Sequence, residues 1–148
     1  MILISHRGNI AGPNPEREND PVYVDEAIQA GYFVEIDLWV IDKITMLGHD
    51  KPQYVIDGLW LEENKQYMFI HCKNAEALAY CLHKFNGFWH ENDDYALTMF
   101  GYVWCYPGKK PIGALSIAVM PEKVQPLSSF DKSGYFGVCS DFVELLNT

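Results

Sequence analysis

Short apolar runs that end abruptly in polar residues mark the first half of the chain. Runs at residues 2–5, 33–40 and 67–72 predict three buried strands, and a run at 44–47 predicts a short additional strand. The segment 8–19 between the first two runs is rich in glycine, proline and asparagine, which predicts a loop. The first half therefore consists of strands joined by longer connections.

Helix signals lie in two of these connections. Asp20 is a suitable N-cap, Pro21 suits the first helical position, and Gly31 suits the end of the helix. Asn74 begins a second helix, in which apolar residues recur with the helical period at positions 75, 78, 79 and 82. This alternation of strands and helices favours a parallel sheet or barrel.

The second half of the chain is rich in strand signals and poor in helix signals. Further strands are predicted at residues 88–90, 96–100, 102–106, 115–120 and 136–139. A complete (β/α)8 barrel takes about 250 residues and seldom fewer than about 200, whereas this chain has 148, which we assign to one domain. We therefore expect an α/β fold, a reduced or compressed TIM-type (β/α) barrel with several helices shortened or missing, or a barrel completed by homo-oligomerisation.

Composition and charge narrow the class of protein. Hydrophobic residues make up 49% of the chain, which is enough for a packed core and excludes a disordered protein. The net charge of −9 argues against nucleic acid as a partner, because like charges repel. No apolar stretch approaches the roughly 20 residues of a transmembrane helix, and the four cysteines form no C-x-x-C pair. We expect a cytoplasmic protein without membrane insertion.

Polar clusters lie in or directly after the predicted strands. They are the triplets His-Arg-Gly at 6–8, Glu-Ile-Asp at 35–37, Gly-His-Asp at 48–50 and His-Cys-Lys at 71–73. The carboxyl ends of the strands of a parallel barrel converge on one mouth, so residues distant in sequence meet there. We therefore expect the four clusters to form one site.

Two of these residues suit a metal ion. Glu35 and Asp37 alternate with apolar residues, so both point to the same face of their strand. Two carboxylates about 6–7 Å apart along a strand repel each other, and a divalent cation removes that repulsion. A solvated polar stripe is the alternative, and the flanking Phe33 and Trp39 argue against it.

The order and spacing of these clusters form a pattern that is more specific than any single cluster. Ser5-His6-Arg7-Gly8, then Glu18-Asn19, then Glu35-Ile36-Asp37 and Gly48-His49-Asp50 resemble the N-terminal signature of the glycerophosphodiester phosphodiesterases. This family belongs to the phospholipase C-like phosphodiesterase superfamily. The resemblance is specific over residues 4–50, and it continues more weakly at 67–74 and 137–142.

The resemblance implies a role for each matching residue. The family's general base and general acid correspond to His6 and His49, and its two phosphate-binding residues correspond to Arg7 and Lys73. A histidine can exchange protons near neutral pH, and an arginine offers phosphate a fork of donors. Glu18 is expected behind the first strand, where it would orient these residues.

One position departs from the family's metal site. Its Glu-x-Asp pair corresponds to Glu35 and Asp37, but His71 replaces its third carboxylate. Carboxylate oxygens suit Mg²⁺ or Ca²⁺ best, whereas an imidazole ligand suits Mn²⁺, Fe²⁺ or Zn²⁺ better than Ca²⁺. Glu122 could supply the missing carboxylate, and a surface residue in a Pro-Glu-Lys turn is the alternative.

Three functions fit these residues. The resemblance implies a metal-dependent hydrolase that cleaves a small glycerophosphodiester-like substrate by general acid–base catalysis. The same residues would serve a lyase that releases a cyclic phosphate by intramolecular attack. A non-catalytic module that binds a phosphorylated ligand is the third alternative. The short chain and His71 favour that module, whereas His6 and His49 argue against it, because phosphate binding needs neither histidine.

Overall fold

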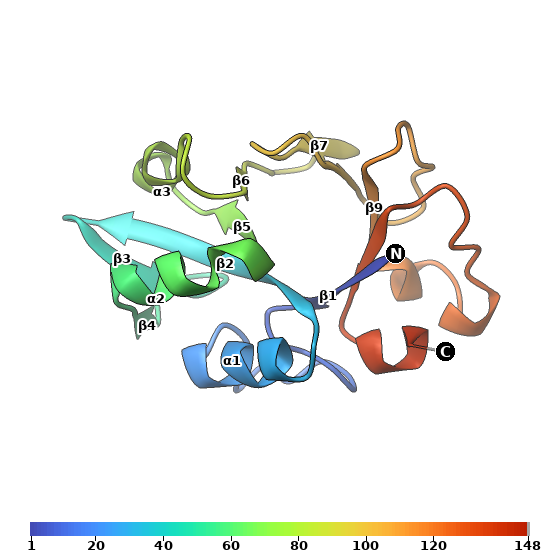
Figure 1. Ribbon diagram of the computed structural model, residues 1–148, viewed down its shortest axis with the longest axis horizontal. Coiled ribbons are helices and arrows are strands. Elements are labelled where there is room, and N and C mark those ends of the chain that lie inside the picture. Colours follow the sequence, from blue (N-terminus) through green and yellow to red (C-terminus); the bar gives the residue numbers. More distant parts are fainter. Residues whose placement is uncertain (148) are drawn as a thin grey trace.

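Ten strands form one curled sheet in the computed structural model, which describes residues 1–147 (Figure 1). The strands are β1 (Ile2–His6), β2 (Phe33–Ile41), β3 (Ile44–Leu47), β4 (Tyr54–Val55), β5 (Met68–Cys72), β6 (Gly87–Phe88), β7 (Tyr95–Leu97), β8 (Val103–Cys105), β9 (Ser116–Val119) and β10 (Gly137–Ser140). Seven of them run parallel in the order β6-β5-β2-β1-β10-β9-β8. An antiparallel strand, β7, follows β8 at one end.

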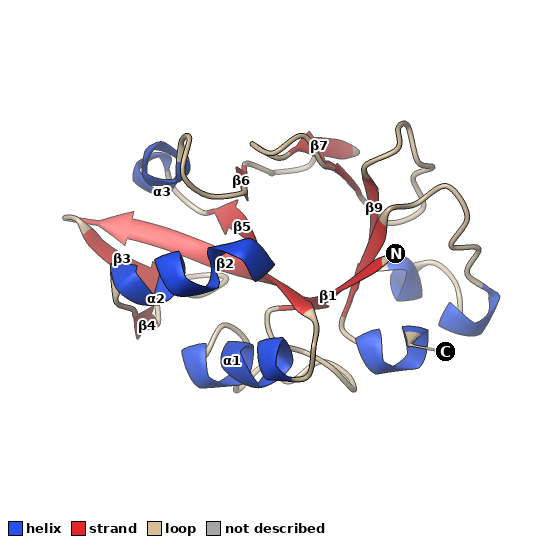
Figure 2. Cartoon of the chain, in the orientation of Figure 1, coloured by secondary structure: helices blue, strands red, loops and turns tan. Residues whose placement is uncertain are grey.

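Helices cover only part of this sheet. The α-helices are α1 (Pro21–Gln29), α2 (Gly58–Asn64) and α3 (Ala75–Cys81), and the short 3₁₀ helices are η1 (Lys65–Tyr67), η2 (Pro121–Lys123), η3 (Leu127–Ser129) and η4 (Val143–Leu146). The three α-helices lie outside the curl, beside its first half (Figure 2). The structure thus confirms the mixed α/β class and the shortage of helices in the second half. Among the described helices, none combines the length and apolar character needed to cross a bilayer.

The ends of α1 and α3 are set by the residues that the sequence indicated. The Asp20 side chain accepts a hydrogen bond from the Val22 amide at the start of α1, and Asn74 does the same from Ala77 at the start of α3. After α1, Gly31 has a φ of +92°, a value that glycine adopts without strain. The predicted extension of α3 to position 82 is wrong, because Leu82 leaves the helical conformation and is exposed.

The core has an inner and an outer part because strand side chains alternate between the two faces of the sheet. The inner cluster, inside the curl, is formed by Ile4, Phe69, Phe88, Ala96, Trp104, Ile117, Val119, Met120 and Cys139. In β2, Val34, Ile36 and Leu38 belong instead to the outer cluster, which packs against the helices. Glu35 and Asp37 therefore point inward, on the face expected from the sequence.

At Gly137, strand β10 packs tightly between its two neighbours, β1 and β9. Gly137 pairs in parallel with Ile2 on one side and Ile117 on the other. A Cβ at this position would lie 2.5 Å from Cγ1 of Ile2, 2.9 Å from the Ile2 carbonyl oxygen and 3.0 Å from Cδ1 of Ile117. Strands β1 and β10 can thus pair only if residue 137 has no side chain.

We expect Gly137→Ala to lower the free energy of unfolding by about 1–3 kcal/mol, the usual cost of overpacking. Urea unfolding followed by circular dichroism measures the change. Gly113→Ala is the matched control, because Gly113 is exposed and an added Cβ would meet no atom within 4 Å. Equal unfolding midpoints for the two variants would contradict the β1–β10 register seen in the structure.

Candidate functional site

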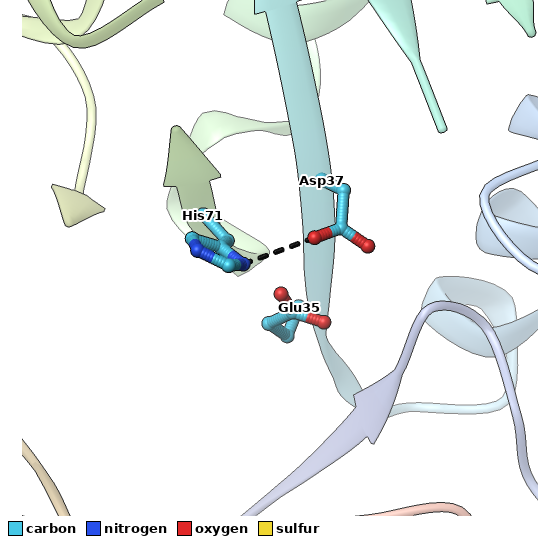
Figure 3. Close-up of side chains that lie close together, drawn as sticks. All are labelled: Glu35, Asp37 and His71. Carbon is cyan, nitrogen blue, oxygen red and sulfur yellow. Dashed lines mark hydrogen bonds and ion pairs between the residues drawn. The ribbon is translucent and has the colours of Figure 1, made fainter. Parts of the chain in front are cut away.

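Polar side chains from four neighbouring strands meet inside the curl. His6 ends β1, Glu35 and Asp37 lie in β2, and His71 lies in β5. Figure 3 shows the side chains of Glu35, Asp37 and His71 turned toward one another. Asp141 directly follows β10 and joins the group from the other side of β1. The expected convergence of the strand ends is therefore present for these residues.

His6 and Asp141 form a partly buried pair. The carboxylate of Asp141 can only accept a hydrogen bond, so Nδ1 of His6 donates to its Oδ1 at 2.7 Å. Burial acts to lower the pKa of His6, but the Asp141 hydrogen bond and the Glu35 charge outweigh it and the pKa is raised. Nε2 of His6 lies 3.9 Å from Oε2 of Glu35. In the neutral ring this Nε2 carries the free lone pair.

Asp141 is itself held by two further residues. Asn9 donates to the carboxylate at 2.8 Å, and Glu122 accepts from the backbone amide of Asp141 at 2.9 Å. The same oxygen of Glu122 also accepts from the Ser140 hydroxyl at 2.8 Å. Glu122 thus supports the end of β10, and it is not part of the Glu35–Asp37–His71 group.

Arg7 connects three parts of the site. Its Nε lies 2.9 Å from Oδ2 of Asp37, its Nη1 donates to Glu18 at 3.1 Å, and its Nη2 contacts Nδ1 of His49 at 2.7 Å. A guanidinium only donates, so Nδ1 of His49 accepts and the ring proton sits on Nε2. Glu18 also accepts from Asn9 at 2.9 Å, and it lines the cavity beside Arg7.

Asp37 is fully buried and surrounded by donors. Asn19 and Arg7 approach one carboxylate oxygen at 3.0 and 2.9 Å, and His71 and Lys73 approach the other at 3.0 and 3.6 Å. Burial alone would raise the pKa of Asp37, but the nearby His49, whose Nδ1 lies 3.4 Å from Oδ2, the hydrogen bond from His71 and the charge of Arg7 hold this pKa well below its usual range. Asp37 therefore stays ionised.

Glu35 has the opposite environment although it lies only two residues away. Its side chain is 5% exposed, and its Oε2 has no hydrogen-bond partner. Burial first, and then the charge of Asp37, raise the pKa of Glu35. An orphaned buried carboxylate oxygen of this kind needs a cation or a proton as its partner.

Glu35, Asp37 and His71 fit a metal ion on these grounds. Each offers one donor atom, and the three donor atoms lie within 4.8 Å of one another. Lys73 lies beside the same carboxylate of Asp37, and Arg7 lies on its other side. Positive charges thus lie beside both oxygens of the Asp37 carboxylate.

A cavity of about 380 Å³ opens in front of these residues. His6, Arg7, Glu35, His49 and His71 line its polar side. Phe88, Trp104, Val119 and Met120 form its apolar side. The volume lies within the usual range of small-molecule sites.

Three supporting residues were not assigned a role from the sequence. Asp141 orients His6, Asn9 holds Asp141, and Asn19 binds both the carboxylate and the amide of Asp37. The segments 18–19 and 137–142 already belonged to the family-like pattern, which was a signal for Asn19 and Asp141. Asn9 had no comparable signal, since it lies in a loop whose path only the structure reveals.

We expect Glu35→Gln to raise the free energy of unfolding of the metal-free protein by about 1 kcal/mol, because it removes a buried charge whose oxygen has no partner. Urea unfolding in the presence of EDTA measures this. Glu63→Gln is the control, since Glu63 is exposed and should leave stability unchanged. A Glu35→Gln protein that is less stable than wild type in EDTA would show that the carboxylate has a protein partner.

Comparison with known proteins identifies no relative of this chain. No protein-family model matches it, and no curated protein or solved structure is significantly similar to it. A function has to be inferred from the residues of the site and their arrangement.

Proposed function

We propose that this protein is a metal-dependent phosphodiesterase that cleaves a small phosphodiester by general acid–base catalysis. One observation carries the proposal: His6, held by Asp141, lies in the same cavity as the unpartnered carboxylate of Glu35 and the guanidinium of Arg7. A proton-accepting group, a site that fits a metal and a phosphate-binding cation are thus within reach of one small substrate.

The order of the strands supports a reduced TIM-type barrel of the glycerophosphodiester phosphodiesterase kind. Around the curl, β1, β2, β5, β6, β7, β8, β9 and β10 follow one another in chain order. Strands β6 and β7 do not pair with each other. The amide of Met99, in the segment after β7, donates a hydrogen bond to the Gly87 carbonyl of β6 at 2.9 Å. Figure 1 shows β7 approaching β6 at this point.

In the proposed reaction His6 is the general base. Asp141 holds the proton of the neutral ring at Nδ1, so that Nε2 is free to accept a proton from the nucleophile. A water nucleophile makes the enzyme a hydrolase, and a neighbouring hydroxyl of the substrate makes it a lyase. The choice between the two depends on which nucleophile lies beside Nε2.

The proposed site also needs positive charge for the phosphate and a proton donor for the leaving group. Arg7 and Lys73 bind the phosphate where negative charge develops. Glu35, Asp37 and His71 would hold the divalent cation, which when bound polarises the phosphoryl group. His49 carries its proton at Nε2 and is the candidate donor to the leaving alkoxide.

We expect His49→Ala to slow the cleavage of an alkyl phosphodiester by roughly 10²–10⁴-fold, the usual contribution of a proton-transfer group. A nitrophenyl diester should be much less affected, because nitrophenolate leaves without a proton. Initial rates on both substrates, with ³¹P NMR of the product, measure this and separate a phosphomonoester from a cyclic phosphate. Equal losses on both substrates would remove His49 from the acid role. Full activity of His6→Ala and His49→Ala would remove both histidines from proton transfer, whereas no cleavage of either diester by the unaltered protein would favour a phosphate-binding module.

Asp141→Asn should reduce turnover by roughly 10²–10⁴-fold, because Asp141 no longer holds the His6 proton at Nδ1. NMR of the histidine nitrogens should show the loss of the Nδ1–H form of His6, which a merely structural role would not produce. Asp42→Asn is the control, since Asp42 is exposed and its φ of +49° suits asparagine equally well. Unchanged histidine signals with reduced turnover would contradict the positioning role.

A further inference from the structure

The ring of His71 is fixed on three sides. Its Nε2 lies 3.3 Å from the backbone carbonyl oxygen of His90, and its plane stacks on Phe88 with centroids 5.2 Å apart and an angle of 7°. Its Nδ1 lies 3.0 Å from Oδ1 of Asp37. These contacts hold Nδ1 toward the carboxylates of β2, as Figure 3 shows.

A neutral His71 cannot satisfy both of these contacts. If the proton sits on Nε2, it is donated to the His90 carbonyl, and a lone pair at Nδ1 then faces the carboxylate of Asp37. If the proton sits on Nδ1, the lone pair at Nε2 faces the carbonyl oxygen. The first arrangement becomes favourable when a cation lies between Nδ1 and the carboxylates. Histidines that bind metals usually donate their second nitrogen to a carbonyl or carboxylate in this way.

Glu35 provides the independent observation that the cluster takes a ligand. Its Oε2 is buried and has no hydrogen-bond partner. Glu35 belongs to the same group of potential ligands as Asp37 and His71. The donor set is therefore one imidazole nitrogen and two carboxylates. Mg²⁺ and Ca²⁺ are hard ions that favour oxygen ligands, whereas an imidazole raises the affinity for first-row transition metals.

We infer that Glu35, Asp37 and His71 bind a first-row transition metal, such as Zn²⁺ or Mn²⁺, in preference to Mg²⁺ or Ca²⁺. The inference rests on the metal site of the proposed phosphodiesterase and specifies its ion. It assigns the His90 carbonyl the task of holding His71 with Nδ1 toward the ion. It also gives a physical reason for a histidine at the position where the resembling family has a carboxylate.

Calorimetric titration of the EDTA-treated protein with the chlorides of Zn²⁺, Mn²⁺, Mg²⁺ and Ca²⁺ tests this, with the unfolding temperature as a second readout. We expect Zn²⁺ to bind more tightly than Mn²⁺, and both at least tenfold more tightly than Mg²⁺ or Ca²⁺. A native-state ligand raises the unfolding temperature in the same order.

Two variants of His71 and one control locate the binding. His71→Gln should weaken Zn²⁺ binding by at least about tenfold. Replacing a residue that only hydrogen-bonds to a metal ligand already costs about this much affinity, and His71 is proposed to be a ligand itself. His71→Glu restores a third carboxylate and should shift the preference toward Mg²⁺ and Ca²⁺. His83→Asn is the control, since His83 is exposed and its φ of +60° suits asparagine. Circular dichroism of each variant before titration verifies that it is folded.

The outcomes separate this inference from the proposed function. Equal binding of Mg²⁺ and Zn²⁺, or Zn²⁺ binding that His71→Gln leaves intact, would overturn the inference. If no cation binds and diester cleavage persists in EDTA, the inference fails while phosphodiester cleavage stands. If Zn²⁺ binds as expected and the Zn²⁺-loaded protein cleaves no diester, the metal site stands and the proposed function fails.

Discussion

The burial of the Asp37 carboxylate is the constraint on which the rest of the site depends. A charge that is fully removed from water must be paired, and an unpaired one destabilises the fold by several kcal/mol. Its partners come from separate segments: Arg7 from the turn after β1, Asn19 from the following loop, and His71 from β5. Arg7 and Asn19 both have positive φ values, +55° and +65°, and the Asn19 amide bonds to the Arg7 carbonyl at 3.0 Å. The pairing of one carboxylate thus accounts for the path of the whole first loop.

The outer face of the curled sheet is covered by α-helices on one half and by shorter segments on the other. The shorter segments explain how a chain of 148 residues can form a curl of this size. Beside β2 and β5 the outer cluster packs against α1, α2 and α3. Beside β9 and β10, Ala118 and Val138 pack instead against Leu127, Phe130 and Leu146, which come from short 3₁₀ turns and loops. The residues of the site lie on the inner face, so they do not depend on which kind of segment covers the outer face.

Local sequence patterns predicted the features that depend on neighbouring residues alone, such as the face of a strand or the start of a helix. The alternation in β2 placed Glu35 and Asp37 on one face, and Asp20 and Asn74 marked the two helix starts. The pairing of His6 with Asp141 joins residues 135 positions apart, and it depends on the parallel register of β1 and β10 that no local pattern encodes. Helix α2 has no clear signal in the sequence, because its seven residues make too few turns to show a helical period.

The carboxylates of Glu35 and Asp37 lie on the same strand but have opposite environments. Asp37 has donors on both oxygens and a lowered pKa, so it holds the fold together and stays charged. Glu35 has a raised pKa and an oxygen without a partner, so it destabilises the protein unless something binds there. A buried group that stability alone disfavours is most simply explained by a ligand that stabilises it. The difference between these two environments is therefore the strongest physical reason to regard the cluster as a binding site rather than as a structural ion-pair network.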